Sequence, residues 1–354
     1  MDIEYLLLLQ SFREYINDAL TPFMEMISLF AVTYLIIVPA FIYWCVDKRS
    51  GLYTIVSYNA SVAFNAVVKL TFCIYRPWIR DSRVMPAGDA ITTATGYSFP
   101  SGHTTTATPI YGALAVCARK KWRWVSVISI ICLLLTAFSR NYLGVHTPQD
   151  VCVGLTIGCL TLWGIASLFK YLTAHPEKEN YFLLAGVIIG ALAILYISLK
   201  SYPTDYVDGK LLVDPERMKK DGFGDIGMFI AVCIGRFIEK TWVKFKPELT
   251  KDNLVKGLTG AVLTFFLIET LGQPTKFLFG VHWGAFVKSM IIIIFIIAVW
   301  PAIMKATARP AEPVKEVTVS AESKKPAANS SSTKAGSGRS KSKKRRSKKA
   351  SSRK

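Results

Sequence analysis

Long apolar runs alternate with short polar connections along most of this chain. A helix crosses the hydrocarbon core of a bilayer with roughly 20 residues. Runs near this length, with boundaries good to a few residues, lie at about 28–46, 52–75, 103–118, 123–139, 150–170, 181–199, 224–239, 254–272 and 282–304. These nine runs predict an all-α integral membrane protein, folded as a helical bundle.

The first segment, at about 4–26, is less clear. It mixes Leu and Phe with Arg13, Glu14, Asn17 and Asp18. Two interpretations stay open at this point: a weakly apolar transmembrane helix, or an amphipathic helix that lies in the membrane interface. As a tenth span, it would place the N-terminus in the cytoplasm.

Composition agrees with residence in a membrane. The chain of 354 residues is 51% hydrophobic, and its mean hydropathy is +0.34. A soluble domain does not need so much apolar content. The net charge of +19 is concentrated near the C-terminus, where residues 305–354 hold 16 Lys and Arg against 3 Asp and Glu.

The residues from Ala306 onward contain almost no large apolar side chains. Such a segment cannot bury a core, so we predict that 306–354 is a disordered polybasic tail. A basic tail beside a bilayer is attracted to anionic lipid headgroups, which are its expected partner. We expect no specific nucleic-acid partner, and nothing in the sequence specifies an oligomeric state.

The charges of the short connections predict the orientation of the spans. One side receives the basic connections 47–51, 119–123, 170–180 and 240–253, together with the tail. Because cytoplasmic connections carry an excess of Lys and Arg, this side and the C-terminus are expected in the cytoplasm. The other side receives 76–102, 140–149, 200–223 and 273–281 and is expected outside.

Two of the three chemically informative clusters flank the connection 76–102. Lys69 and Arg76 lie two helical turns apart near the end of one apolar run, so both can project to one face. Alternatively, they extend to the lipid headgroups. In the second cluster, Pro100-Ser101-Gly102-His103, Ser101 is a good N-cap, and free backbone N–H groups after it suit a phosphate. A simple capped helix is the alternative.

The third cluster lies in the connection 140–149. Ser139-Arg140 is followed by His146, and Asp150 comes four residues later, after the helix-starting sequence Thr147-Pro148. The Asp150 carboxylate can return to one imidazole nitrogen, which fixes the tautomer and leaves the other nitrogen free to attack. A lone His–Asp pair of this kind is more often structural.

Together, the three clusters place three cations, two histidines, one aspartate and two helix N-termini at one membrane boundary. Cations and backbone N–H groups can neutralise the oxygens of a transferring phosphoryl group. One histidine can act as the nucleophile and the other as the acid for the leaving oxygen. This is the set of groups that phosphoryl transfer without a metal requires.

The motifs K-x6-RP, PSGH and SR-x5-H-x3-D resemble those of the type 2 phosphatidic acid phosphatase superfamily, and every motif position is present. The resemblance covers about 28–170, and the stretch around PSGH is similar to bacterial members such as undecaprenyl-diphosphate phosphatases and phosphatidylglycerophosphatases. It implies that His146 forms a phosphohistidine, Asp150 raises its basicity and His103 protonates the leaving oxygen. The implied phosphate-binding residues are Lys69, Arg76, Ser101, Gly102 and Arg140, and no metal or cofactor is expected.

The apolar runs and the resemblance together predict a domain organisation. We expect an amphipathic or weakly apolar transmembrane helix at 1–27 and a six-helix phosphatase core at 28–172, which carries the three motifs. About four further transmembrane helices at 173–305, outside the motifs, and the cytoplasmic tail at 306–354 follow it. The resemblance to bacterial members implies the bacterial plasma membrane, and the charges of the connections predict that the active site is extracytoplasmic.

The membrane setting favours a lipid phosphate as substrate. The candidates are an isoprenyl diphosphate such as undecaprenyl diphosphate, phosphatidic acid, phosphatidylglycerophosphate or a sphingoid-base phosphate, and the similarity to bacterial members favours the first three. Alternative functions are hydrolysis of a soluble phosphoester, phosphate transfer between lipids, and a catalytically inactive membrane scaffold or transporter.

Charged residues in the later apolar runs are further candidates. Arg236, Glu269 and Lys288 lie inside or near these runs. Charges inside a membrane are expensive and are often functional, although a structural ion pair is the simpler explanation.

Overall fold

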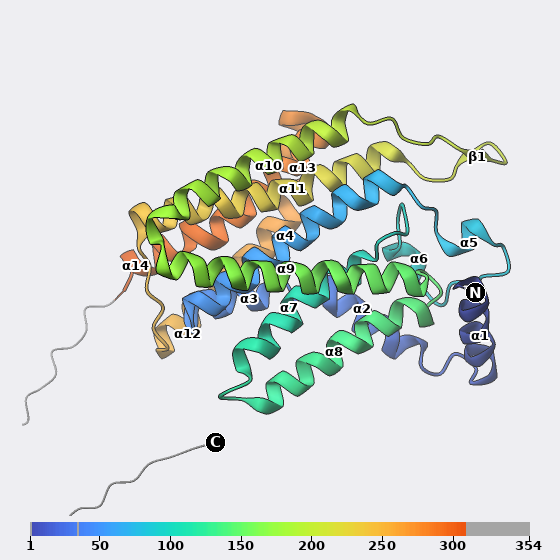
Figure 1. The fold of residues 1–354 in the computed structure, drawn as a ribbon, viewed down its shortest axis with the longest axis horizontal. Coiled ribbons are helices and arrows are strands. Elements are labelled where there is room, and N and C mark those ends of the chain that lie inside the picture. The colour runs from blue at the N-terminus through green and yellow to red at the C-terminus, as the bar shows by residue number, and fades with distance from the viewer. Residues whose placement is uncertain (1, 34, 309–354) are drawn as a thin grey trace, which may run out of the picture. The chain divides into compact units, whose positions relative to one another are not determined.

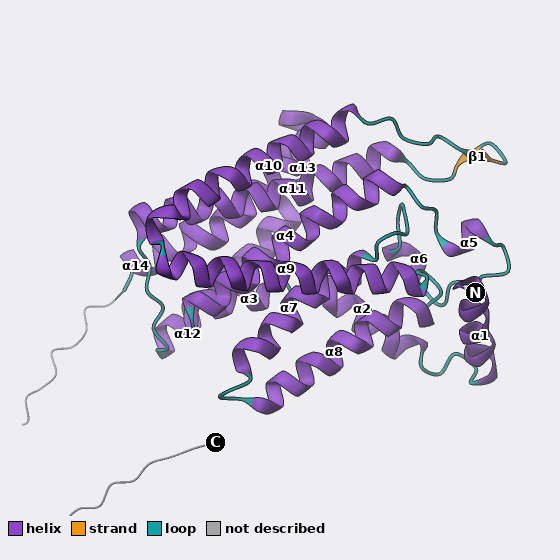
Figure 2. Cartoon of the chain, in the orientation of Figure 1, coloured by secondary structure: helices purple, strands orange, loops and turns teal. Residues whose placement is uncertain are grey.

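The structure, a computed structural model, describes residues 2–33 and 35–308 and is almost entirely helical (Figures 1 and 2). The prediction of a disordered tail therefore falls largely outside the described residues. The helices are α1 Asp2–Tyr15, α2 Thr21–Thr33, α3 Ile37–Cys45, α4 Lys48–Phe72, α5 Pro77–Arg80, α6 Ala90–Thr93, α7 Gly102–Ala118, α8 Arg123–Tyr142, α9 Pro148–Ala174, α10 Glu179–Leu199, α11 Pro215–Ile238, α12 Lys251–Thr270, α13 Gly272–Ile294 and α14 Trp300–Ala306.

Smaller elements complete the described chain. A 3-10 turn at Pro176–Lys178 precedes α10, and π-helical segments follow α11 at Glu239–Val243 and α13 at Phe295–Val299. The short strands β1 Tyr206–Val207 and β2 Lys210–Leu211 form an antiparallel hairpin between α10 and α11. The predicted all-α class is confirmed.

Length and apolar composition identify the helical segments that can cross a bilayer. Among the described residues, six segments meet both conditions, or seven if the bent pair α2–α3 counts as one span. The predicted run 28–46 is thus two helices, inclined by 49° to one another. The predicted runs 103–118 and 224–239 correspond to α7 and α11, which are outside this group: α7 has only 17 residues, and the first turns of α11 are charged.

The first segment is not one helix of 4–26, because a turn at 16–20 separates α1 from α2. At 1.5 Å per residue, α1 is about 21 Å long, shorter than the roughly 30 Å hydrocarbon core. Arg13 of α1 is buried and donates to the carbonyls of Tyr142 at 3.0 Å and Met85 at 2.6 Å. These contacts tie α1 to the end of α8, which favours an interfacial helix over a tenth span.

Two groups of helices share α4. Helix α7 packs against α4, α8 and α9, whereas α11 packs against α4, α10 and α13 (Figure 1). A side chain at Gly222 of α11 would meet Leu70 of α4, since a Cβ there would lie 2.7 Å from Leu70 Cδ1. Helix α11, which follows α9 and α10 in the chain, is therefore in direct contact with α4.

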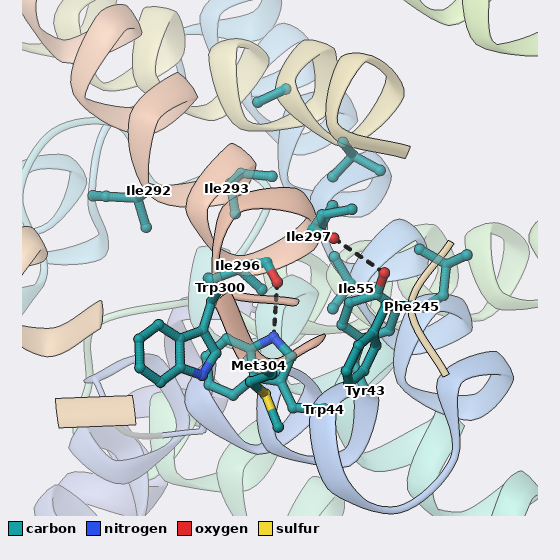
Figure 3. Packing of buried hydrophobic residues seen from close by; sticks show 14 of the residues in the cluster. Tyr43, Trp44, Ile55, Phe245, Ile292, Ile293, Ile296, Ile297, Trp300 and Met304 are labelled. Carbon is teal, nitrogen blue, oxygen red and sulfur yellow. Dashed lines mark hydrogen bonds between the residues drawn. The ribbon is translucent and has the colours of Figure 1, made fainter. Parts of the chain in front are cut away.

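A buried cluster joins α3 to the last helices (Figure 3). The Tyr43 hydroxyl donates to the Ile297 carbonyl at 3.1 Å, and the Trp44 indole N–H donates to the Ile296 carbonyl at 2.8 Å. Both acceptors lie in the π-helical segment Phe295–Val299. A π-helical turn changes the backbone hydrogen bonding, and here two side chains pair with its carbonyls.

Candidate active site

The three sequence clusters meet at one end of the helical bundle. Lys69 lies in the last turn of α4, and Arg76 follows it as the N-cap of α5. Ser101 and Thr147 cap the starts of α7 and α9, whereas Arg140 lies in the last turn of α8. Helix ends from four separate parts of the chain therefore converge.

Lys69 holds the loop that leads into α7. Its ammonium donates to the carbonyls of Tyr97 at 3.0 Å, Ser98 at 3.3 Å and Pro100 at 2.6 Å. An ammonium has three donors, so these carbonyls can occupy all of them. Lys69 also lines a cavity at this end of the bundle, called the central cavity below, where its positive charge can attract an anion.

Arg76 connects the same loop to His146. Its guanidinium donates to the carbonyls of Gly96 at 3.1 Å, Thr95 at 3.2 Å and Val145 at 2.9 Å. The Nη1 atom also lies 2.7 Å from His146 Nε2. Arg76 is buried, and its rigid fork fixes the relative positions of two loops.

The contact with Arg76 defines the tautomer of His146. A guanidinium has no acceptor atom, so His146 Nε2 accepts this hydrogen bond and carries no proton. The imidazole proton is then on Nδ1, which lies 3.4 Å from Asp150 Oδ2 and 3.4 Å from Ser98 Oγ. Nε2, the nitrogen that carries the lone pair, therefore faces the Arg76 guanidinium, and its lone pair becomes available for attack when this hydrogen bond is released.

Asp150 is fixed from several directions. Its Oδ2 accepts from the Ser98 hydroxyl at 2.5 Å and from the Thr147 N–H at 2.9 Å. The Asp150 N–H donates in return to Thr147 Oγ1 at 3.4 Å, which completes a capping box at the start of α9. The Asp150 carbonyl also accepts from the Ser101 N–H at 2.9 Å, so α9 and the start of α7 are tied together.

His146 lies in the connection between α8 and α9 and is 1% exposed. Burial lowers the pKa of its imidazole well below the usual value, and the charges of Arg76, Arg140 and Lys69 lower it further. The neutral form required of a nucleophile is therefore stabilised.

His103 and Gly102 open the first turn of α7. The His103 side chain is 8% exposed, and its Nε2 has no hydrogen-bond partner in the described chain. A Cβ at Gly102 would meet nothing within 4 Å, so the backbone there faces open space. The Ser101 hydroxyl accepts from the Thr104 N–H at 3.5 Å and acts as the helix cap.

A cavity of about 380 Å³ brings most of these groups together. Its lining includes five of the predicted site residues, which are Lys69, Arg76, Gly102, His103 and His146. Asp150 and Ser101 lie behind this lining and position it. The described residues contain no group of three or more His, Cys, Asp or Glu side chains arranged to hold a metal ion.

Arg140 differs from the other predicted phosphate-binding residues. It is fully buried, donates to the Ser28 hydroxyl and lines a neighbouring cavity of about 270 Å³. Its Nε and Nη2 atoms have no partner among the described residues. Its charge still acts on His146, and Thr93 borders both cavities. The structure thus places Arg140 beside the central cavity rather than in its lining.

Three residues of the site were not predicted. Ser98 bridges Asp150 and His146, and Asp221 and Asp225 line the cavity from α11. Ser98 looked like an ordinary loop residue, because only the folded loop turns it toward Asp150. Asp225 had a usable signal, since it lies at the start of the apolar run 224–239. Arg236, a further candidate from the sequence, pairs with Glu179 and Glu239 at the other end of α11.

The fold and its apolar helices define a helical membrane protein whose polar site is built from the ends of α4, α7, α8 and α9. Residues 50–174 match the model of the PAP2 superfamily. This part of the chain is therefore a PAP2 superfamily domain, as the three motifs predicted.

Curated relatives carry the names of phosphatases. The chain is 29% identical over 134 residues to the undecaprenyl-diphosphatase of Sulfolobus acidocaldarius, which covers 38% of this chain and 58% of that protein. It is 27% identical over 178 residues to phosphatidylglycerophosphatase B of Bacillus subtilis, 48% of this chain and 80% of that protein. Lipid A 4′-phosphatase of Bacteroides thetaiotaomicron aligns over 85 residues with 28% identity, covering 24% of this chain and 37% of that protein. No solved structure matches the chain.

Proposed function

We propose that this protein hydrolyses a phosphate monoester or diphosphate of a membrane lipid through a phosphohistidine on His146. The observation that carries the proposal is the contact of His146 Nε2 with Arg76 in a cavity that His103 also lines. A neutral imidazole nitrogen, a phosphate-binding cation and an unpartnered second imidazole are thereby in one place. The names of the relatives support the same class of reaction.

The first step transfers the phosphoryl group to His146. A phosphate oxygen accepts the hydrogen bond that Arg76 Nη1 donates to His146 Nε2 in the free protein, and Nε2 is thereby released. The Nε2 lone pair then forms the N–P bond as the ester O–P bond breaks. His103, as the imidazolium, gives its proton to the leaving oxygen, and the Asp150 carboxylate stabilises the positive charge that develops on His146.

The second step releases the phosphate. Water attacks phosphorus, the N–P bond breaks and the electron pair returns to His146 Nε2. His103 accepts the proton of the attacking water and becomes an imidazolium again. The products are the dephosphorylated lipid and inorganic phosphate, and both histidines return to their starting states.

The proposed site opens on the extracytoplasmic side of the membrane. The opposite ends of the helices carry basic groups at 48–49, 119–123 and 240–246, as cytoplasmic connections do. Counting α2–α3, α4 and α7–α13 as nine crossings leaves the N-terminus on the side of the site and the C-terminus in the cytoplasm. A lipid headgroup phosphate would then reach the cavity from the outer leaflet.

Phosphate release by the purified protein in mixed micelles tests this proposal. The panel contains phosphatidic acid, phosphatidylglycerophosphate, an isoprenyl diphosphate and a soluble phosphoester. We expect the full chain to release phosphate from at least one lipid, and His146→Ala to abolish the release. His175→Ala is the matched control, because His175 lies exposed beyond the end of α9. Equal activity of His146→Ala and the unmodified protein would refute the mechanism.

A further inference from the structure

Helix α11 contributes to the active-site cavity although it lies outside the family match of 50–174. Met218, Asp221 and Asp225 line the cavity together with Lys69 and His103. The cavity is therefore shared between the superfamily domain and a later helix. Two of the three residues from α11 are acidic, which is unexpected beside a phosphate-binding site.

Contacts with the superfamily domain hold α11 in place. The Tyr97 N–H donates to Met218 Sδ at 3.3 Å, in the same loop whose carbonyls bind Lys69. A Cβ at Gly96 would lie 1.8 Å from Met218 Sδ, so this loop and α11 approach closely at Gly96. The position of the acidic residues in the cavity is thus defined by packing.

The two carboxylates occupy one face of α11. Asp221 and Asp225 are four residues apart, one turn of helix, where like charges repel. The Asp221 side chain is 42% exposed and lies 3.6 Å from the Lys220 ammonium, whereas Asp225 lies one turn farther along α11 and is more deeply buried. The Asp225 carboxylate forms no hydrogen bond and no ion pair with any described residue. The positive charge of Lys69 is close enough to interact with it electrostatically.

An unpaired carboxylate does not help to bind phosphate. It repels the anion, and this repulsion is strongest for a diphosphate, which carries more negative charge. A carboxylate is only an acceptor, so the groups that it stabilises are hydrogen-bond donors and cations. The cations Lys69 and Arg76 line the same cavity, so it has a part suited to an anion and a part suited to a hydrogen-bond donor. His103 Nε2, buried and without a partner among the described residues, is a further polar atom in this cavity that a ligand could contact.

We propose that Asp225, with Asp221 nearer the rim, binds a hydrogen-bond donor of the substrate that lies close to the phosphate ester. The donor is a hydroxyl or an ammonium group of the lipid headgroup region. This inference rests on the proposed function and narrows its substrate class to lipid monophosphates with such a donor. A sphingoid-base phosphate offers an ammonium and a hydroxyl, lysophosphatidic acid offers a hydroxyl, and phosphatidic acid offers neither.

The test compares kcat/KM for these three lipids, in the full chain and in variants of α11. For Asp225→Asn, we expect the ratio of sphingoid-base phosphate to phosphatidic acid to fall about tenfold, the effect of losing one charged hydrogen bond. The amide of Asn keeps an acceptor oxygen for a hydroxyl, so the kcat/KM ratio of lysophosphatidic acid to phosphatidic acid falls less. For Asp225→Ala, we expect the ratios of both lipids to phosphatidic acid to fall. We expect Asp221→Asn to give a smaller shift in the same direction. This variant tests the proposal if the Asp225 variants fail to fold.

Asp208→Asn is the matched control, because Asp208 lies exposed in the hairpin between β1 and β2. Its ratios should equal those of the unmodified chain. Unchanged ratios in the α11 variants, or parallel changes for all three lipids, would show that the carboxylates only balance the charge of the cavity. If the unmodified chain released phosphate from no lipid, the proposed function itself would be wrong and this inference would fall with it.

Discussion

The two ends of α4 show two different uses of buried charge. At its start, the Lys48 ammonium lies 2.5 Å from Glu239 and 2.7 Å from the Phe245 carbonyl. Glu239 is fully buried and is also paired with Arg236 at 2.5 Å and the Phe245 N–H at 2.9 Å. Lys48, Glu239 and Arg236 thus each have a charged partner within the protein, so this network is closed.

At the other end of α4, polar groups remain unpaired around the central cavity and the neighbouring cavity that Arg140 lines. His103 Nε2 and two nitrogens of Arg140 have no partner among the described residues, and the Asp225 carboxylate forms no ion pair there. An unpaired buried polar group is costly unless a ligand completes it. The comparison therefore separates a structural ion network, whose members pair with one another, from the proposed binding site, where a substrate would pair with the groups that remain.

The largest expected effect tests the closed end. Removing one partner of a buried ion pair leaves an uncompensated charge, at a cost of roughly 3–5 kcal/mol. We expect Glu239→Ala to lower the free energy of unfolding by this amount, because Lys48 and Arg236 then lose their partner. Thermal unfolding in detergent measures it. The exposed residue Glu248 gives the control Glu248→Ala, and equal unfolding temperatures for both variants would contradict a structural role.

The next effect tests the cavity end of α4, where polar groups remain unpaired. Arg76→Ala should lower kcat for lipid phosphate hydrolysis by roughly 10²–10³, the usual effect of removing one group that stabilises the transition state. We expect a smaller change in the unfolding temperature than for Glu239→Ala. The control is Arg83→Ala, since Arg83 pairs with Asp81 and Glu4 in the exposed part of the same connection. A variant that loses stability but keeps kcat would reverse the roles that we assign to the two ends.

A smaller effect concerns the protonation of His146. Burial and the three cations lower its pKa below the ordinary value of 6.5, so the folded protein keeps His146 neutral as the pH falls through that value. An unfolded chain would take up the proton there, so this residue makes the fold less stable in acid. We expect imidazole nitrogen NMR to show a midpoint below 6.5, with the signal assigned by its loss in His146→Gln. A midpoint at or above 6.5 would mean that the cations are not close to the imidazole.

Sequence patterns predicted the parts of the site that are local in the chain. The spacing of His146 and Asp150 predicted a carboxylate close to one imidazole nitrogen, and the structure places it 3.4 Å away. Ser101 was expected at the start of a helix and caps α7. These features depend on a few neighbouring residues, for which the spacing along a helix is sufficient.

The features that depend on long-range packing could not be predicted. Ser98 reaches Asp150 across 52 positions of sequence, through a loop held by Lys69. Asp225 enters the cavity only because α11 packs on α4. Apolar periodicity shows that a helix is buried, but it does not show which helix is its neighbour. For the same reason, Arg140 was expected with the other cations, although it lines the adjacent cavity.

The central claim is that His146 Nε2 becomes bonded to phosphorus during turnover. Rapid mixing of the protein with a radiolabelled lipid phosphate, followed by quenching in base, would trap this species if it forms. We expect the label on the peptide that contains His146 in the unmodified chain, and no label in His146→Ala. Steady release of phosphate without a labelled His146, or with the label on another residue, would contradict the account.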